Sequence, residues 1–202
     1  MDSETPSSHT ATAGDPRWFS GCAIAALVLA GLMVFGAVEL MNVEKGLDGY
    51  GQLEQAGSSG SAAEPLGAGE TAQYEDGLKV TVSAPRAEAD GTYEFSVIYD
   101  NGTDHQLRPG GQSFDDSVSD LGPAPLVVRP GRSLDDYVSD FDLTLLDGQT
   151  SASALLPPLG AGGKRTVPVR IKPTRAGIPF TVEVAPPDAG YRDTAYFQLT
   201  AG

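Results

Sequence analysis

The pattern of apolar and polar positions divides the chain into one long apolar run and a series of short alternating segments. Residues 18–38, WFSGCAIAALVLAGLMVFGAV, contain no charged side chain. At ~1.5 Å rise per helical residue this run spans roughly 30 Å, the thickness of the hydrocarbon core of a membrane. It predicts a single transmembrane helix, which we place at 18–41.

A cleaved signal peptide is the main alternative to a membrane span. The apolar core of a signal peptide is normally shorter than this run, and Phe35 and Ala37 do not form the small-x-small pair that a signal peptidase requires. Cys22 resembles the cysteine of a lipoprotein, but it stands where the apolar run begins and not after it. Arg17 precedes the run and acidic residues follow it, which favours a cytoplasmic N-terminus and an extracytoplasmic C-terminal domain.

Beyond residue 70 the pattern changes to alternating apolar and polar positions, which is typical of half-buried strands. The alternation is clearest at 93–100, where positions 93, 95, 97 and 99 are apolar or aromatic, while Ile98 on the other face suggests a central strand. Further strands are expected at 70–74, 78–82, 126–128, 141–145, 166–171, 180–184 and 195–199. About seven short strands with no soluble helix predict an all-β fold, an immunoglobulin-like β-sandwich over 70–202.

The remaining segments lack apolar periodicity. Residues 1–17 are rich in Ser, Thr, Pro and acids, a composition that predicts a disordered cytoplasmic tail. Residues 42–69, which end in GYGQLEQAGSSGSAAEPLGAG, predict a flexible linker rich in Gly, Ser and Ala. No cysteine follows Cys22, so an apolar core without disulfides must hold the domain together.

The formal net charge of −14 limits the classes of binding partner that we expect. Nucleic acids and anionic lipid headgroups reward Lys and Arg, so neither is an expected ligand of this acidic chain. The charge favours solubility and the attraction of cations. Frequent Ala, Gly, Pro, Asp and Arg are the bias of a high-GC genome and indicate a bacterial source.

The order of segments 69–82, 93–103, 141–148 and 159–169 resembles that of bacterial cell-surface domains with an immunoglobulin-like fold. Those domains are related to secreted mycobacterial immunoprotective antigens. The motifs that carry the resemblance are GLKVTV, the NGT that ends the second segment, and LGAGG leading into TVPV. The resemblance implies a non-enzymatic module that hangs from an anchor after a small-residue spacer, and it carries over no catalytic residue. Residues 104–137 are longer than it implies, which leaves the strand order there open.

An acidic motif occurs twice, as SFDDSVSDL at 113–121 and SLDDYVSDF at 133–141. Clustered carboxylates supply the oxygen ligands that Ca²⁺ prefers, although the spacing matches no EF-hand. The candidate Ca²⁺ ligands are Asp115, Asp116, Asp120, Asp135, Asp136 and Asp140. Two alternatives stay open: a solvated acidic loop, and a capped helical turn with Ser113 or Ser133 as its N-cap.

No catalytic signature and no cofactor site emerge from the sequence. His105 is the only histidine after the N-terminal tail, and no G-x-S-x-G motif accompanies it. The segment GAGGKRT has Arg165 where a phosphate loop needs Ser or Thr. Asn101-Gly102-Thr103 is formally a glycosylation acceptor, but Asn-Gly predicts a hairpin turn.

Aromatic residues near the end of the chain and in the second acidic motif have two interpretations. Strand-core packing is the simpler one, since sandwich interiors use alternating aromatic residues. An exposed patch for a protein or glycan partner is the other. The residues concerned are Tyr137, Tyr191, Tyr196 and Phe197.

Anchor, spacer and sandwich together predict a single-pass protein of the cell membrane whose extracytoplasmic domain binds an envelope or extracellular protein without catalysis. One alternative is a Ca²⁺-binding envelope module that uses the repeated acidic motif. Another is an envelope hydrolase or its accessory subunit, which would need two carboxyl groups a few ångströms apart in a cleft.

A Ca²⁺ site in the repeated motif would raise the thermal unfolding midpoint by several degrees, since a ligand at 100 times its Kd stabilises the folded state by about 2.7 kcal/mol. The rise should need Ca²⁺, disappear with chelator, and be lost when Asp115, Asp116, Asp135 and Asp136 are changed to Asn. An unchanged midpoint would assign these residues to solvated loops.

Overall fold

The computed structural model of the chain describes residues 51–54, 59–120, 122–132, 142–186 and 192–202. The chain divides into two units, 1–47 and 48–202, and every described residue belongs to the second. Within the described ranges no helix has the length and apolar character needed to cross a membrane. The predicted tail at 1–17 and the predicted span at 18–41 lie outside the described residues.

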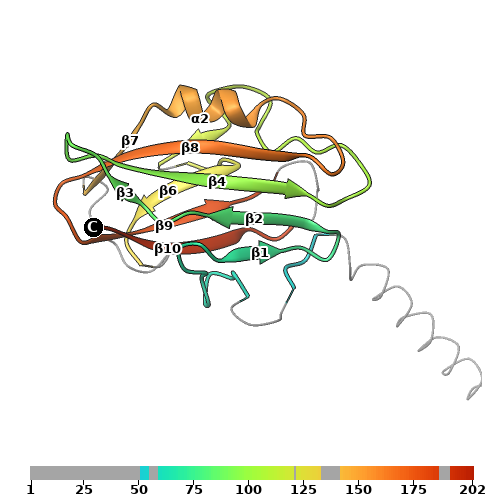
Figure 1. Ribbon diagram of the computed structural model, residues 1–202, viewed down its shortest axis with the longest axis horizontal. Coiled ribbons are helices and arrows are strands. Elements are labelled where there is room, and N and C mark those ends of the chain that lie inside the picture. Colours follow the sequence, from blue (N-terminus) through green and yellow to red (C-terminus); the bar gives the residue numbers. More distant parts are fainter. Residues whose placement is uncertain (1–50, 55–58, 121, 133–141, 187–191) are drawn as a thin grey trace, which may run out of the picture. The chain divides into compact units, whose positions relative to one another are not determined.

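Two β-sheets packed face to face build the domain, so the prediction of an all-β sandwich is confirmed (Figure 1). The six-stranded sheet has the order β1-β2-β4-β8-β7, with β3 paired to β4 at its start. Its strands are β1 (Thr71–Gln73), β2 (Leu78–Val82), β3 (Arg86–Ala87), β4 (Tyr93–Asn101), β7 (Leu143–Leu146) and β8 (Lys164–Pro173).

The second sheet has four strands in the order β10-β9-β6-β5. All of its pairings are antiparallel except that of β5 with β6, which is parallel. In the described part of 104–137 the chain therefore forms β5 and β6 of the second sheet, with β5 at its edge. The strands are β5 (Val118–Ser119), β6 (Leu126–Pro130), β9 (Ile178–Val184) and β10 (Ala195–Ala201).

Alternation places the core between the sheets. Along β4 every second residue is buried, and β4 lies between β2 and β8, as the apolar Ile98 on its outer face predicts. The rings of Phe95 on β4 and Phe180 on β9 lie with their centroids 5.5 Å apart and join the two sheets. The described residues form ten strands against the seven or so expected, since the two-residue strands β3 and β5 carry no periodic signal.

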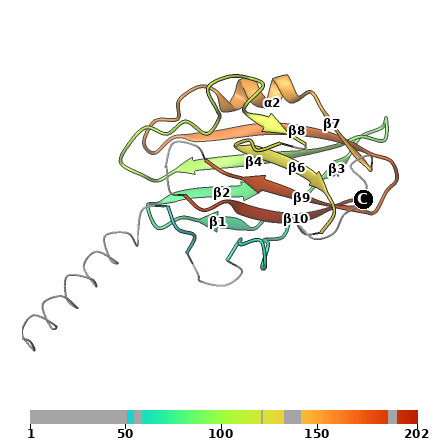
Figure 2. The same cartoon turned by 180° about the vertical axis from the view of Figure 1, so that it is seen from behind.

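One helix contradicts the prediction of no soluble helix. Helix α2 (Gly148–Leu155) begins directly after Asp147, its N-cap. Its eight residues, GQTSASAL, are too few and too polar for a helical pattern to stand out. Ala152 and Leu155 are buried, and the hydroxyl of Ser151 donates to the carbonyl of Pro168 on β8 at 2.6 Å. The helix therefore covers the edge of the sandwich beside β8. Helix α2 lies uppermost in Figures 1 and 2.

The opposite edge is covered by residues that the sequence assigns to the flexible linker at 42–69, and for the described part of that range the prediction is wrong. Leu53 and Leu66 are only 8% and 4% exposed and belong to the core. We call the described residues 51–54 and 59–66 the strap, with 51–54 as its first arm and 59–66 as its second arm. Small and polar residues dominate the strap, so two leucines in its sequence give no periodic signal.

Each arm of the strap pairs with a different sheet. The first arm runs along β1, where the amide of Glu54 donates to the carbonyl of Gln73 at 2.8 Å. The second arm touches β10, where the amide of Leu66 donates to the carbonyl of Tyr196 at 2.9 Å. Strands β1 and β10 lie side by side at the lower edge in both Figure 1 and Figure 2. The strap thus joins the two sheets across that edge.

Replacing Leu66 by Ala should lower the free energy of unfolding by roughly 2 kcal/mol, because a buried leucine loses its packing. Urea denaturation of the purified chain measures this change. The exposed Glu64 in the same arm provides the control, since Glu64→Ala should change stability by no more than about 0.5 kcal/mol. Equal effects of the two substitutions would mean that the second arm is a linker after all.

Candidate functional site

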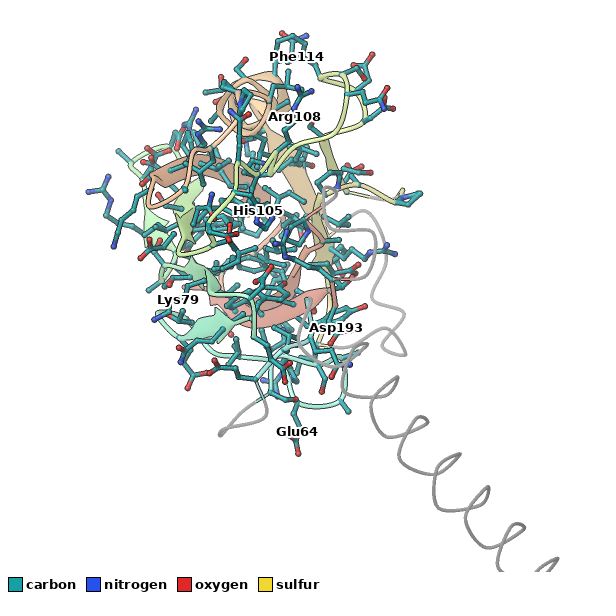
Figure 3. All side chains as sticks on the ribbon, turned by 90° about the vertical axis from the view of Figure 1, so that its right-hand side faces the viewer. Glu64, Lys79, His105, Arg108, Phe114 and Asp193 are labelled. Carbon is teal, nitrogen blue, oxygen red and sulfur yellow. The ribbon has the colours of Figure 1, made fainter. Side chains whose placement is uncertain are left out.

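The first copy of the acidic motif forms a tight turn between Gly111 and Ser117. The buried Ser117 hydroxyl donates to the carbonyl of Ser113 at 2.6 Å and accepts the amide of Gly111 at 3.1 Å. Ser113 donates its own hydroxyl to Asp116 at 2.6 Å, so it does not act as the predicted helix N-cap. Phe114 stands at the apex, 49% exposed, and projects from the upper edge of the end view in Figure 3.

The predicted Ca²⁺ site is only half described. Asp115, Asp116 and Asp120 lie on or next to this turn, whereas Asp135, Asp136 and Asp140 lie outside the described residues. Across the described ranges no three acidic, histidine or cysteine side chains come together as metal ligands would. Ca²⁺ binding by the six residues therefore stays a prediction.

Asn101 does not form the predicted hairpin turn. It ends β4, which pairs with β2 and β8 and not with the strand that follows it in sequence. The side chain is fully buried, and its amide donates to the carbonyls of His105, Leu159 and Gly160 at 2.9 to 3.0 Å. Its carbonyl oxygen accepts both the amide and the hydroxyl of Thr103. A glycosyl chain on Asn101 would be incompatible with this environment.

The described aromatic residues near the C-terminus are divided between the two faces of β10. Phe197 is buried in the core, as the strand-packing interpretation expects. Tyr196 lies on the outer face opposite Glu183 of β9. Burial raises the pKa of Tyr196, and the nearby Glu183 carboxylate adds to the effect. Tyr137 and Tyr191 lie outside the described residues.

Two basic strand residues, Arg129 of β6 and Lys164 of β8, pair with neighbouring carboxylates. Arg129 Nε lies 2.8 Å from Glu183 Oε1 on the outer face of the four-stranded sheet, in an ion pair whose geometry is not that of an aligned hydrogen bond. Burial raises the pKa of Glu183 despite the opposing effect of Arg129. In GAGGKRT, Lys164 begins β8 and lies 2.9 Å from Asp100. A strand in place of a helix rules out a phosphate loop there.

The densest set of charges surrounds Arg170 on the outer face of the six-stranded sheet. Its guanidinium donates to Glu88 Oε2 at 2.7 and 2.9 Å and to Asp147 Oδ2 at 2.8 Å. Asp90 Oδ2 lies 3.5 Å away, and the Thr92 hydroxyl donates to Glu88 at 2.6 Å. The cluster joins the β3–β4 connection, β8 and the turn before α2.

Asp147 has a backbone conformation that L-residues seldom adopt. Its φ of 52° is the only positive value at a non-glycine position in the described part of the chain. Such a residue costs of order 1 kcal/mol or more unless its surroundings hold it. The bond from Arg170 ties the Asp147 side chain to β8 and so fixes the point at which α2 begins.

Hydrogen bonding controls the protonation of this cluster. The Thr92 hydroxyl, followed by Arg170, lowers the pKa of Glu88, and Thr92 likewise lowers that of Asp90. The hydrogen bonds that Arg170 donates to Asp147 and Glu88 raise the pKa of Arg170. These shifts favour the charged forms of Glu88, Asp90 and Arg170 at neutral pH.

A buried ion pair fastens the first arm of the strap to the sandwich. Arg192 and Asp76 have side chains only 2% and 9% exposed, with Arg192 Nε 3.0 Å from Asp76 Oδ2. Gly51 packs directly on Arg192, and a Cβ at residue 51 would lie 2.5 Å from its Cγ. Asp193 accepts the amide of Leu53 at 3.2 Å, which fixes the arm in place.

Tyr74 lies beside this ion pair, and Tyr99 lies near Tyr74. The Tyr74 hydroxyl donates to the carbonyl of Asp193 at 3.0 Å, and burial raises its pKa. Burial raises the pKa of Tyr99 as well. The Tyr99 hydroxyl and Arg192 Nη1 are buried without a hydrogen-bond partner among the described residues.

Comparison of the chain with protein-family models, curated proteins and solved structures finds no match. The resemblance to immunoglobulin-like surface domains therefore stays a prediction. The Arg170 cluster was not predicted from the sequence, because its acids lie 82 and 23 positions from Arg170 and only the strand register brings them together.

Replacing Arg170 by Gln should lower stability at pH 7 and reduce its dependence on pH. Glu88 and Asp90 have lowered pKa values in the folded state, so they add stability above the unfolded value of ~4 and lose it as the pH falls through the folded values. Urea unfolding at pH 7 and at pH 3 measures the difference. Arg86→Gln is the control, since Arg86 is 80% exposed and lies 3.5 Å from Glu94. Identical pH profiles of wild type and Arg170→Gln would contradict this assignment.

Proposed function

We propose that the protein is a single-pass, membrane-anchored binding module whose β-sandwich lies outside the cytoplasm and has no catalytic activity of its own. The observation that carries the proposal is that three arginines of the domain form ion pairs within the fold. In the described domain Arg129, Arg170 and Arg192 each pair with carboxylates on neighbouring strands or turns. These groups hold the fold together, whereas an enzyme needs acids and bases that converge on a cleft.

The strap adds a second argument, which concerns distance from the membrane. With the first arm seated on β1, only residues 42–50 separate the end of the predicted span from the sandwich. Even fully extended, this segment reaches no further than roughly 30 Å, at ~3.3–3.6 Å per residue. The domain would therefore remain near the membrane surface and meet partners in the same membrane or just outside it.

The partner that fits best is an envelope or extracellular protein. The net charge of −14 disfavours nucleic acid and anionic lipid surfaces. The immunoglobulin-type arrangement is part of the same proposal, because such sandwiches commonly bind proteins through loops and strand edges.

Membrane anchoring is tested by fractionating cells that express the full chain. The protein should remain in the membrane after an alkaline wash, and protease added to intact cells should remove the sandwich. Leu29→Arg places a charge at the centre of the predicted span, which costs roughly 2.5–3.5 kcal/mol and should release the protein. Leu29→Ala, the matched control, should stay in the membrane. Release of wild type by the wash, or protection of the sandwich from protease, would contradict the proposal.

A further inference from the structure

The outer edge of β10 is only partly covered by the strap. Tyr196 and Gln198 direct their backbone groups toward this edge, where three hydrogen bonds of 2.7 to 2.9 Å join them to the second arm. The Tyr196 amide donates to Gly60, the Leu66 amide donates to Tyr196, and the Gln198 amide donates to the carbonyl of Leu66. Leu66 is thus paired with β10 in parallel orientation.

The arm leaves β10 before the strand ends. Gly67 and Glu70 form a turn, in which the amide of Glu70 donates to the carbonyl of Gly67 at 3.2 Å, and this turn directs the chain to β1. Because alternate residues of a strand face the same edge, the Gln198 carbonyl and both backbone groups of Thr200 face outward as well. They have no backbone partner on that edge among the described residues.

The second arm occupies the position of a neighbouring strand beside β10 but does not form a regular strand itself. Gly60 and Leu66 both contact Tyr196, and the residues between them turn back on themselves, with the Gly60 amide donating to Glu64 at 3.1 Å. Leu66 is the only large apolar side chain of the arm. By contrast, β9 pairs with all seven residues of β10 on its other side. The arm is therefore held to β10 far less firmly than β9 is.

Pro65 prevents a further strand from pairing regularly with the outer side of the arm. The amide of Leu66 is used for β10, so the preceding position faces away from the sheet, where proline offers no N–H. A further strand cannot add regularly to an edge that presents proline. While the arm is in place, the sheet ends there.

We propose that the outer edge of β10 is a docking site for an extended segment of a partner protein, and that the second arm of the strap occupies this site until the partner displaces it. This inference rests on the proposed binding function, and it specifies the binding site and the kind of segment that binds there. A regular strand parallel to β10 would replace the three bonds of the arm. It would also continue past the point where the arm turns away and pair with Gln198 and Thr200, which gives it an advantage over the arm.

The arm indicates which segment fits. An apolar side chain is needed where Leu66 is buried. In the arm itself small residues accompany this leucine, and a Cβ on Gly60 would lie 3.2 Å from Leu66 Cδ1. The segment must carry backbone N–H groups, and therefore no proline, at the positions that face β10.

Peptide binding to the full chain in detergent tests the proposal. The fluorescent peptide KSATLTATK offers a leucine between small residues and is long enough to reach Thr200, whereas KSATL stops where the arm stops. The longer peptide should bind roughly tenfold or more tightly than the shorter one, since it makes additional backbone hydrogen bonds. KSATDTATK, with Asp in place of Leu, should not bind measurably.

Release of the arm should strengthen binding, because the arm competes from within the same chain at a high effective concentration. Leu66→Gly removes its apolar anchor and should bind KSATLTATK at least tenfold more tightly than wild type. Glu64→Gly, in the same arm but exposed, should bind as wild type does. Equal affinity of wild type and folded Leu66→Gly, or no preference for the longer peptide, would overturn the proposal.

Hydrogen exchange of the wild-type chain keeps the test decisive if Leu66→Gly does not fold. The amides of Leu66 and Gln198 should exchange together through a local opening, at least a hundredfold faster than that of Val97 in β4. Exchange at the rate of Val97 would mean that the arm opens only when the domain unfolds, and the site would not exist. Neither measurement depends on the membrane, so failure of the anchoring experiment is distinguishable from failure here.

Discussion

The apolar layer between the two sheets is the interaction on which the rest of the domain depends. The sandwich contains no cysteine, so no covalent link supports it. Each buried side chain such as Phe95 or Phe180 contributes roughly 1.5–3 kcal/mol, whereas an exposed ion pair contributes about 0–1 kcal/mol. The inward positions decide whether the chain folds. The charges on the outer faces then decide how firmly loops and turns are held.

A two-layer sandwich has two open edges, and this chain closes them by different means. A helix directly after β7 covers one, and a segment that precedes β1 covers the other. The second solution makes the segment nearest the predicted anchor part of the core, through Leu53 and Leu66. The same segment pairs with β10 only as far as Leu66, and on the six-stranded sheet its first arm pairs with Gln73 and Glu75. One segment thus contacts the edge strands of both sheets.

The sequence predicted those parts of the fold in which the side-chain period is informative. Strands β2, β4, β9 and β10 alternate strongly, because one face of each must meet the other sheet. The strap escaped prediction because two leucines among small residues show no period, and α2 because eight mostly polar residues do not form an amphipathic pattern. The Arg170 cluster and the environment of Asn101 depend on register between distant segments. No local pattern encodes such a register.

The environment of Asn101 has a chemical consequence for the lifetime of the chain. Asn-Gly sequences deamidate readily when the backbone nitrogen of the glycine can attack the side-chain amide, and the usual product is an aspartate or isoaspartate. In the folded domain the amide of Asn101 is fixed by three carbonyl acceptors and is removed from solvent. A carboxylate at this position would direct negative charge at the same three oxygens. Folding thus protects Asn101 from deamidation. A chain that deamidates before it folds can no longer donate these hydrogen bonds from residue 101.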